Sequence, residues 1–164
     1  MIEGNLPSTQ LDNIDRAILD ELQSDAKLNI KDLSAKLGLT KTSVYERIKR
    51  LESLGLIDRY VALLNREKLG TSMIVFCFVS LNTQQIKEIE NFSASVMGIP
   101  EVMECYLMAG QNDFMLKVIV KDLGDYHKFS SGKLAALPNV SQIKSAFVLN
   151  EIKKETSLSF LIES

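Results

Sequence analysis

The sequence predicts an α+β protein of two small domains, the first helical and the second an alternation of strands and helices. Before residue 55, apolar residues recur at the three-to-four spacing of helices. From Ser72 onward, runs rich in Val, Ile and Phe alternate with helical patterns. Ile99-Pro100-Glu101-Val102 and Leu137-Pro138-Asn139-Val140 each stand between a helical and a strand-like stretch, which indicates an internal repeat. We place the domains at residues 1–62 and 72–164, with residues 63–71 as a linker.

The bulk composition is that of a globular chain. Of its 164 residues, 46% are apolar and 24% are charged. The longest apolar run, Met73 to Val79, is far shorter than the roughly 20 residues of a membrane span. Residues 1–5 lack the basic and apolar blocks of a signal peptide. Cys77 and Cys105 lie in apolar, strand-like stretches and suit reduced core residues. We therefore expect a cytoplasmic protein.

Charge is distributed unevenly, although the formal net charge is only -2. Residues 1–26 hold six acids and one base, whereas residues 27–50 hold seven bases and two acids. A basic block confined to one short stretch suits a surface that contacts phosphates. The alternative is an ordinary solvated face.

Capping residues divide the first domain into three helices. Asp12, Asn29 and Thr40 are each suited to begin a helix, and Gly38 and Gly55 are suited to end one. The short middle helix, the turn at Gly38 and the longer third helix have helix-turn-helix spacing. The residues expected to face inward are Ile14, Ile18, Leu22, Leu33, Leu37, Val44, Ile48 and Leu51.

The third helix leaves a polar and basic face outward, which predicts double-stranded DNA as a partner. Its early side chains are short and polar and suit base edges, and its later ones are bases that suit phosphate or guanine. We expect Arg47→Ala and Arg50→Ala to weaken DNA binding without unfolding the domain. Leu56 to Ala62 reads as a strand and a possible wing. The candidate DNA-binding residues are Lys41, Thr42, Ser43, Glu46, Arg47, Lys49 and Arg50.

The second domain reads as two strand–helix–strand halves, which make a ferredoxin-like βαββαβ (ACT-like) sheet with both helices on one face. The first strand, from Met73, is apolar on both faces, so its open face needs a cover. The simplest cover is a second subunit, which predicts a homodimer. The expected strands cover Met73 to Leu81, Met103 to Met108, Phe114 to Val120 and a last one to about Glu151; the expected helices are one capped by Thr83, with Ile86, Ile89, Phe92 and Val96 inward, and one over Leu123 to Leu137.

Five stretches, in combination and order, resemble a known family. They are Leu11 to Leu19, Val44 to Ile57, Tyr60 to Ala62, Lys68 to Gly70 and Cys105 to Asp113. The chain resembles the leucine-responsive/asparagine-regulator (Lrp/AsnC, "feast/famine") transcription factors of prokaryotes. The resemblance implies an amino-terminal winged helix-turn-helix, a carboxy-terminal amino-acid-sensing domain, and dimers that assemble into octamers.

The resemblance also implies an effector site between dimers, near a loop with a glycine and an aspartate. In this sequence the candidates are Gly110, Gln111, Asn112 and Asp113, with Ser145 as a looser match. Asp113 suits the ammonium of a free amino acid, and loop amides near Gly110 suit its carboxylate. Gln111 and Asn112 favour a polar ligand such as glutamine or asparagine. The alternative is a plain turn in which Asp113 caps backbone amides.

Three classes of function follow. The leading one is a sequence-specific transcriptional regulator whose assembly or DNA affinity responds to an amino acid or related metabolite. The second is an architectural oligomer that wraps or bridges DNA without a small effector. An enzyme is disfavoured because no nucleophile–base set, metal cluster or phosphate loop is visible and the single histidine, His127, suits a surface position. We expect no cofactor and no membrane partner.

Overall fold

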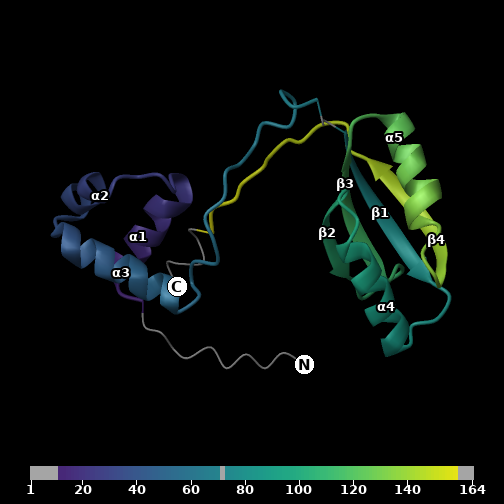
Figure 1. The fold of residues 1–164 in the computed structure, drawn as a ribbon, viewed down its shortest axis with the longest axis horizontal. Helices are drawn as coiled ribbons and strands as arrows, with labels where there is room; N and C mark the ends of the chain where they lie inside the picture. The colour runs from purple at the N-terminus through teal and green to yellow at the C-terminus, as the bar shows by residue number, and fades with distance from the viewer. Residues whose placement is uncertain (1–10, 71–72, 159–164) are drawn as a thin grey trace. The chain divides into compact units, whose positions relative to one another are not determined.

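The computed structural model describes residues 11–70 and 73–158. The chain forms two compact units (Figure 1). The described residues up to Leu63 form a helical unit, and those from Leu64 to Ile152 form a sheet unit. Residues 153–158, which we expected in the second domain, group with the helical unit. There the backbone N–H of Leu158 donates to Gln23 Oε1 over 2.6 Å. None of the described helices is long and apolar enough to cross a membrane.

Three helices form the first unit, and the predicted caps are confirmed. They are α1 (Asn13–Ser24), α2 (Ile30–Leu37) and α3 (Lys41–Ser53). Asn29 Oδ1 accepts from the Lys31 amide over 2.8 Å, and Thr40 Oγ1 accepts from the Ser43 amide over 3.2 Å. Their core contains Ile18, Leu33, Val44, Ile48 and Leu51, as predicted from helical spacing.

Gly38 makes the turn between α2 and α3. It adopts the left-handed conformation at φ +66°, and no atom lies within 4 Å of a Cβ built there. Its N–H donates to the carbonyl of Ala35, and the N–H of Leu39 donates to that of Ser34 over 2.9 Å. Glycine adopts this conformation without the steric cost of a Cβ, so that α2 ends at Leu37 and α3 begins at Lys41, with three residues between them.

The predicted wing strand over Leu56–Ala62 is wrong for this structure, because these residues adopt no regular secondary structure. A strand needs a second strand to satisfy its backbone groups, and none of the described segments pairs with this one. Tyr60 is instead held through its side chain, whose hydroxyl donates to Glu52 Oε1 over 3.0 Å.

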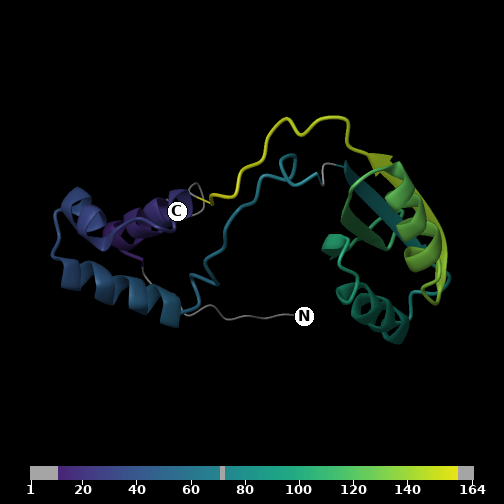
Figure 2. The same ribbon diagram turned by 45° about the horizontal axis from the view of Figure 1, so that its top comes forward.

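The second unit is a four-stranded antiparallel sheet in the order β2-β3-β1-β4, as expected for a ferredoxin-like fold. Helices α4 and α5 lie on the same side of it (Figure 2). Strand β1 lies between β3 and β4. The predicted Gly110–Asp113 loop precedes β3 and the predicted Ser145 lies on β4, so these two candidate segments are on opposite sides of β1. The elements are β1 (Met73–Leu81), α4 (Ile86–Met97), β2 (Val102–Leu107), β3 (Phe114–Val120), α5 (Leu123–Lys128), the π-helix η1 (Phe129–Leu134) and β4 (Val140–Phe147).

The two faces of β1 differ in how they are covered. Val75, Cys77 and Val79 are fully buried beneath the helices. Phe76 and Phe78 alternate with them and are only partly buried on the opposite, open face. The prediction that helices cover one face of this strand is therefore confirmed, and the open face keeps Phe76 and Phe78 partly accessible.

Three local predictions in this unit are wrong. Thr83 does not cap α4, which begins at Ile86 after Gln85. The side chain of Asn139 pairs with Thr83 instead, donating to its carbonyl over 2.9 Å and accepting from its amide over 3.2 Å. Ile86 is 76% exposed because it lies in the first turn of α4, beyond the edge of the core. The helix expected over Leu123–Leu137 changes to a π-helix at Phe129.

Two further differences from the predictions concern the end of β4 and the exposure of Cys105 on β2. The last strand ends at Phe147 rather than near Glu151, although the Val148 amide still donates to the Ile74 carbonyl over 3.0 Å. Both cysteines are free thiols, but only Cys77 is buried. Cys105 is exposed because β2 is an edge strand with a neighbour on one side only.

Candidate DNA interface and effector loop

The outward face of α3 is polar, as the sequence predicts. Val44, Ile48 and Leu51 lie in the core, and Thr42, Glu46 and Lys49 lie on the opposite side of the helix and are exposed. The buried face fixes the rotation of α3, so these outward side chains are presented together on one surface. The exposed Lys41 begins the helix beside them.

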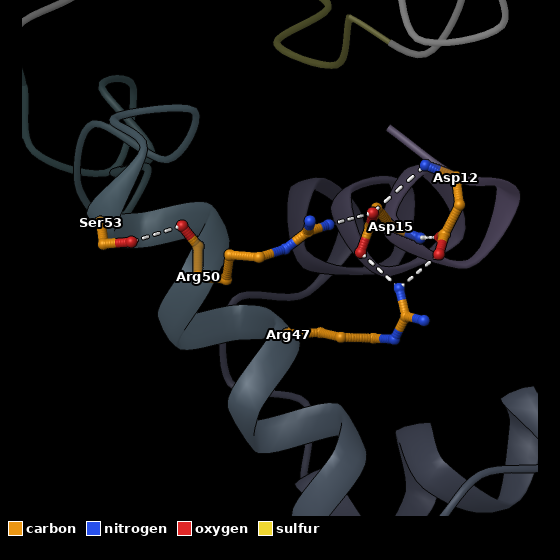
Figure 3. A network of polar contacts seen from close by, with 5 residues as sticks. All are labelled: Asp12, Asp15, Arg47, Arg50 and Ser53. Atoms are coloured by element: carbon orange, nitrogen blue, oxygen red, sulfur yellow. Dashed lines mark hydrogen bonds and ion pairs between the residues drawn. The ribbon is translucent and has the colours of Figure 1, made fainter. Parts of the chain in front are cut away.

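Arg47 and Arg50 are not free cations on that surface, because carboxylates of the α1 amino end bind them (Figure 3). Arg47 Nη1 donates to Asp12 Oδ2 over 2.7 Å and to Asp15 Oδ1 over 2.8 Å. Arg50 Nη2 donates to Asp15 Oδ2. The side chain of Asp15 is fully buried, whereas those of Arg47 and Arg50 are 28% and 47% exposed. We call these four residues the α1–α3 ion cluster.

The two aspartates of the cluster also form the N-terminal cap of α1. Asp12 Oδ1 accepts from the Asp15 amide over 2.8 Å, and Asp15 Oδ2 accepts from the Asp12 amide over 3.2 Å. The Asp15 amide and the Arg47 guanidinium lower the pKa of Asp12 below its ordinary value. Hydrogen bonds to the carboxylates of Asp12 and then Asp15 raise the pKa of Arg47. Asp12 therefore uses one carboxylate oxygen for the helix and the other for Arg47.

The charge asymmetry of the sequence is partly cancelled in space. Lys36 pairs with Glu21 over 2.5 Å, and Arg47 and Arg50 pair with the α1 carboxylates. Three of the seven bases in residues 27–50 are thus bound by acids from residues 1–26. We therefore expect removal of Arg47 and Arg50 to destabilise the helical unit, because their loss leaves Asp15 buried without a counter-charge.

The candidate DNA-binding residues predicted from the sequence did not include Asp12, Asp15 or Tyr45. A signal for Asp15 was present: it lies three residues before Ile18, within the apolar stripe of α1, where a carboxylate requires a partner. Tyr45 is 50% exposed on α3, and the Lys49 ammonium lies 5.8 Å from its ring centroid. Lys49 also pairs with Glu52 over 2.8 Å.

The loop from Gly110 to Asp113 joins β2 to β3. Gly110 has φ +154°, a backbone conformation that L side chains rarely adopt. Asp113 is almost fully buried, and its two carboxylate oxygens accept from the Leu81 amide and from Gln84 Nε2, each over 2.7 Å. The carbonyl of Asp113 accepts from the Met108 amide over 2.8 Å. These bonds match the alternative in which Asp113 closes a turn.

Asn112 contributes a hydrogen-bond acceptor that is not in use within the described loop. Its Oδ1 is buried and has no hydrogen-bond partner among the described residues. A buried acceptor without a partner is costly and invites a donor. Gln111 is exposed next to it.

Ser145 does not join this loop within one chain. It lies on β4 opposite Cys77 of β1, and Phe114, which follows the loop, lies opposite Val79 on the other side of β1. The Ser145 hydroxyl bonds instead to Tyr126 Oη. Burial, and after it the hydrogen bond with Cys77, raises the pKa of Tyr126 to about 12. The contact between Tyr126 and Ser145 therefore joins two neutral hydroxyls.

Comparison with known proteins decides the family. Residues 11–52 match the AsnC-type helix-turn-helix domain, and residues 74–158 match the Lrp/AsnC ligand binding domain. The chain belongs to the Lrp/AsnC family of transcriptional regulators.

Full-length relatives support this assignment. The leucine-responsive regulatory protein of Salmonella typhimurium is 39% identical over 152 residues, which cover 93% of each chain. A transcriptional regulator of Neisseria meningitidis, solved as a complex with L-Met, has a TM-score of 0.86 at 34% identity and covers 90% of this chain and 96% of its own. An AsnC family regulator of Agrobacterium tumefaciens has a TM-score of 0.85 at 37% identity, with the same coverage.

The two surfaces of this Lrp/AsnC regulator therefore have different chemistry. The helix-turn-helix unit is the DNA-binding part, and the sheet unit is the ligand-binding part. The described residues contain no cluster of three or more His, Cys, Asp or Glu side chains that would hold a metal ion. His127 is exposed, as predicted, with its Nδ1 3.4 Å from Ser131 Oγ. The family consists of transcriptional regulators rather than enzymes.

Proposed function

We propose that this Lrp/AsnC regulator reads specific operator sequences with α3 and that an amino acid changes its assembly or DNA affinity. The observation that carries the first half is the polar outward face of α3, opposite the buried Val44, Ile48 and Leu51. A helix held in this way enters the major groove with its amino-terminal side chains toward base edges. Each guanidinium carries five N–H donors, and among the described residues only Nη1 of Arg47 and Nη2 of Arg50 have side-chain partners.

Each residue has a role in the proposed complex. Thr42, Ser43 and Glu46 face bases, with Glu46 suited to the cytosine amino group. Lys41 and Lys49 contact phosphates, and Arg47 and Arg50 share base and phosphate contacts from fixed positions. Two such helices in a dimer would read two half-sites about 34–36 Å apart.

Selection from a pool of random duplexes tests the DNA half of the proposal. We expect the protein to enrich a two-part motif, which footprinting then locates on genomic fragments. Lys41 is exposed and makes no ion pair within the described residues, so Lys41→Ala should reduce the salt slope of binding by about one. Lys87→Ala, an exposed lysine of α4, is the matched control and should leave the slope unchanged. Enrichment of no motif would overturn sequence-specific reading.

The effector half of the proposal concerns the Gly110–Asp113 loop. The family domain binds ligands, and the Neisseria meningitidis regulator was solved with L-Met. The unpartnered Asn112 Oδ1 supports a role in accepting from the ammonium of an amino acid. Loop amides near Gly110 suit its carboxylate, and the exposed Gln111 suits a polar side chain. Ser145 would contribute only from a neighbouring subunit.

Calorimetry with each of the twenty amino acids, L-methionine and glutamine among them, tests the effector half. We expect one or a few to bind, and Asn112→Ala to weaken binding at least tenfold. Asp113→Ala is a poor first variant, because it also leaves the buried Leu81 amide unpaired. Footprints that are broad and insensitive to every amino acid would favour the alternative, an architectural protein that wraps DNA.

A further inference from the structure

We infer that Asp12, which lies outside α3, is a positioning residue that sets the DNA specificity of this regulator by restraining Arg47. Its carboxylate lies 2.7 Å from Arg47 Nη1 and ties the guanidinium to the amino end of α1. The inference goes beyond the proposed function, which concerns residues that touch DNA. It rests on the use of α3 for binding DNA.

The reason lies in the two kinds of DNA binding. Non-specific affinity comes from cations that neutralise phosphates and release counterions, whatever the sequence. Specific affinity requires donors held at fixed positions against base edges. A freely rotating arginine at the edge of α3 would contribute to both. An arginine bound to carboxylates keeps its remaining N–H groups in one place and loses much of its attraction for phosphates elsewhere.

The position of the cluster supports this reading. Asp12, Arg47 and Arg50 line one shallow depression together with Ser43 and Glu46, which belong to the candidate DNA-binding surface. Asp12 is the exposed member of the acid pair, with 49% of its side chain accessible, whereas Asp15 is fully buried. A DNA phosphate near Arg47 would therefore compete directly with Asp12. Binding at an arbitrary sequence has to overcome that competition without the compensating base contacts of an operator.

The structure provides a variant that removes the ion pair between Asp12 and Arg47, keeps the helix cap and leaves the bond of Arg47 to Asp15 in place. Asp12 Oδ1 caps α1 through the Asp15 amide, and Oδ2 binds Arg47. Asn caps helices as well as Asp does. With its one side-chain oxygen on the Asp15 amide, the atom that replaces Oδ2 is an NH₂ group, which donates and cannot accept from Arg47. Asp12→Asn thus preserves the first bond and deletes the second. Asp12→Ser, a second good capping residue without charge, is the independent repeat.

Asp32→Asn is the matched control. Asp32 is an exposed acid in the first turn of α2, and it makes no ion pair within the described residues. Its replacement changes the net charge of the helical unit by the same amount as Asp12→Asn. Any difference between the two variants therefore comes from the contact with Arg47 rather than from net charge.

The experiment measures the affinity of the full chain for two duplexes over a range of salt concentrations, the selected operator and a shuffled sequence of equal length. We expect Asp12→Asn and Asp12→Ser to bind the shuffled duplex more tightly than Asp32→Asn, by about eightfold at 0.1 M salt, with a salt slope steeper by about 0.9. Operator affinity should change less, so the ratio of specific to non-specific affinity should fall. A purely structural role predicts weaker binding to both duplexes and an unchanged slope.

The result also separates the inference from the proposed function. If wild-type protein does not prefer its operator, the proposed function fails, and the inference about specificity fails with it. If wild type does prefer it, equal salt slopes and equal shuffled-duplex affinities in Asp12→Asn and Asp32→Asn overturn the inference alone. In an Arg47→Gln background, Asp12→Asn should add no more than Asp32→Asn does; an undiminished effect there would also overturn it.

Discussion

At the scale of single residues, the most informative side chain is Asp15. Its carboxyl group is fully buried and accepts from two arginines of another helix. A buried charge is tolerated only when it is paired and hydrogen-bonded. The residues that present the candidate DNA surface are therefore also part of what joins α1 to α3.

We predict a large loss of stability when both arginines are removed. Arg47→Ala with Arg50→Ala leaves the Asp15 carboxylate buried beside the Asp12 amide alone, which should reduce the free energy of unfolding by about 3 kcal/mol. Urea unfolding measures it. Lys49→Ala is the control, because its pair with Glu52 is exposed and such pairs contribute about 0–1 kcal/mol. A loss below about 1 kcal/mol in the double variant would contradict the structure.

The stability of the helical unit should depend on acid pH through Asp12. The pKa of Asp12 is lowered from 3.8 by the Asp15 amide and Arg47. The contribution of the charged form is therefore fully present above pH 3.8 and is lost as the pH falls through the lower folded value. The stability difference between wild type and Asp12→Asn should be constant at higher pH and shrink below that point. Urea unfolding at a series of pH values checks it, and a difference that grows on acidification would refute the assignment.

At the scale of elements, two glycines with open surroundings should respond in opposite ways to alanine. Gly38 has φ +66° between α2 and α3, whereas Gly132 lies in η1 without a positive φ, and neither has an atom within 4 Å of a built Cβ. Gly38→Ala should cost about 1–2 kcal/mol, because an L side chain is strained in the left-handed conformation. Gly132→Ala should stabilise by about 0.4–1 kcal/mol by restricting the unfolded chain. Thermal unfolding compares them, and equal signs would contradict the backbone geometry.

Local patterns were enough to predict most elements. The caps at Asp12, Asn29 and Thr40 determine where three helices begin, and strict alternation identified β3 as Phe114–Val120. What failed depends on partners distant in the sequence. Nothing near Thr83 announces that Asn139 pairs with it.

In the candidate site, too, local patterns could be predicted, whereas contacts with residues distant in the sequence could not. The polar face of α3 follows from helical spacing, so its outward residues could be predicted. The state of Arg47 and Arg50 could not, because their carboxylate partners lie on α1, more than thirty residues earlier. Likewise the strand-like composition of Leu56–Ala62 says nothing about whether a second strand pairs with it.

At the scale of the whole molecule, the open face of the sheet leads us to predict a homodimer. Phe78 lies on that face opposite Met115 of β3 and Lys144 of β4. If a second subunit covers this face, Phe78→Asp buries an unpaired charge and should separate the subunits. Light scattering should give twice the 18.4 kDa chain mass, or multiples of that dimer up to an octamer, for wild type and the single mass for the variant.

Ile86→Asp provides the control for the dimer prediction. Ile86 is 76% exposed on α4, which lies on the other side of the sheet. The substitution introduces the same charge on an apolar surface residue away from the proposed interface, and the mass should not change. A monomeric wild type at micromolar concentration would contradict the prediction.

The chain has two separate hydrophobic cores, and no described residue belongs to both. Ile18, Leu33, Val44 and Leu51 fill one core without any residue of the other unit, and Val75, Phe92, Leu116 and Phe129 fill the other core in the same way. Each core is therefore complete within its own unit, which is the condition for exchanging one unit without repacking the other. A gene fusion that joins this helical half to a sheet unit with a different ligand preference needs no core to be repacked. Such an exchange has to include both connections between the units, because residues 153–158 group with the helical unit.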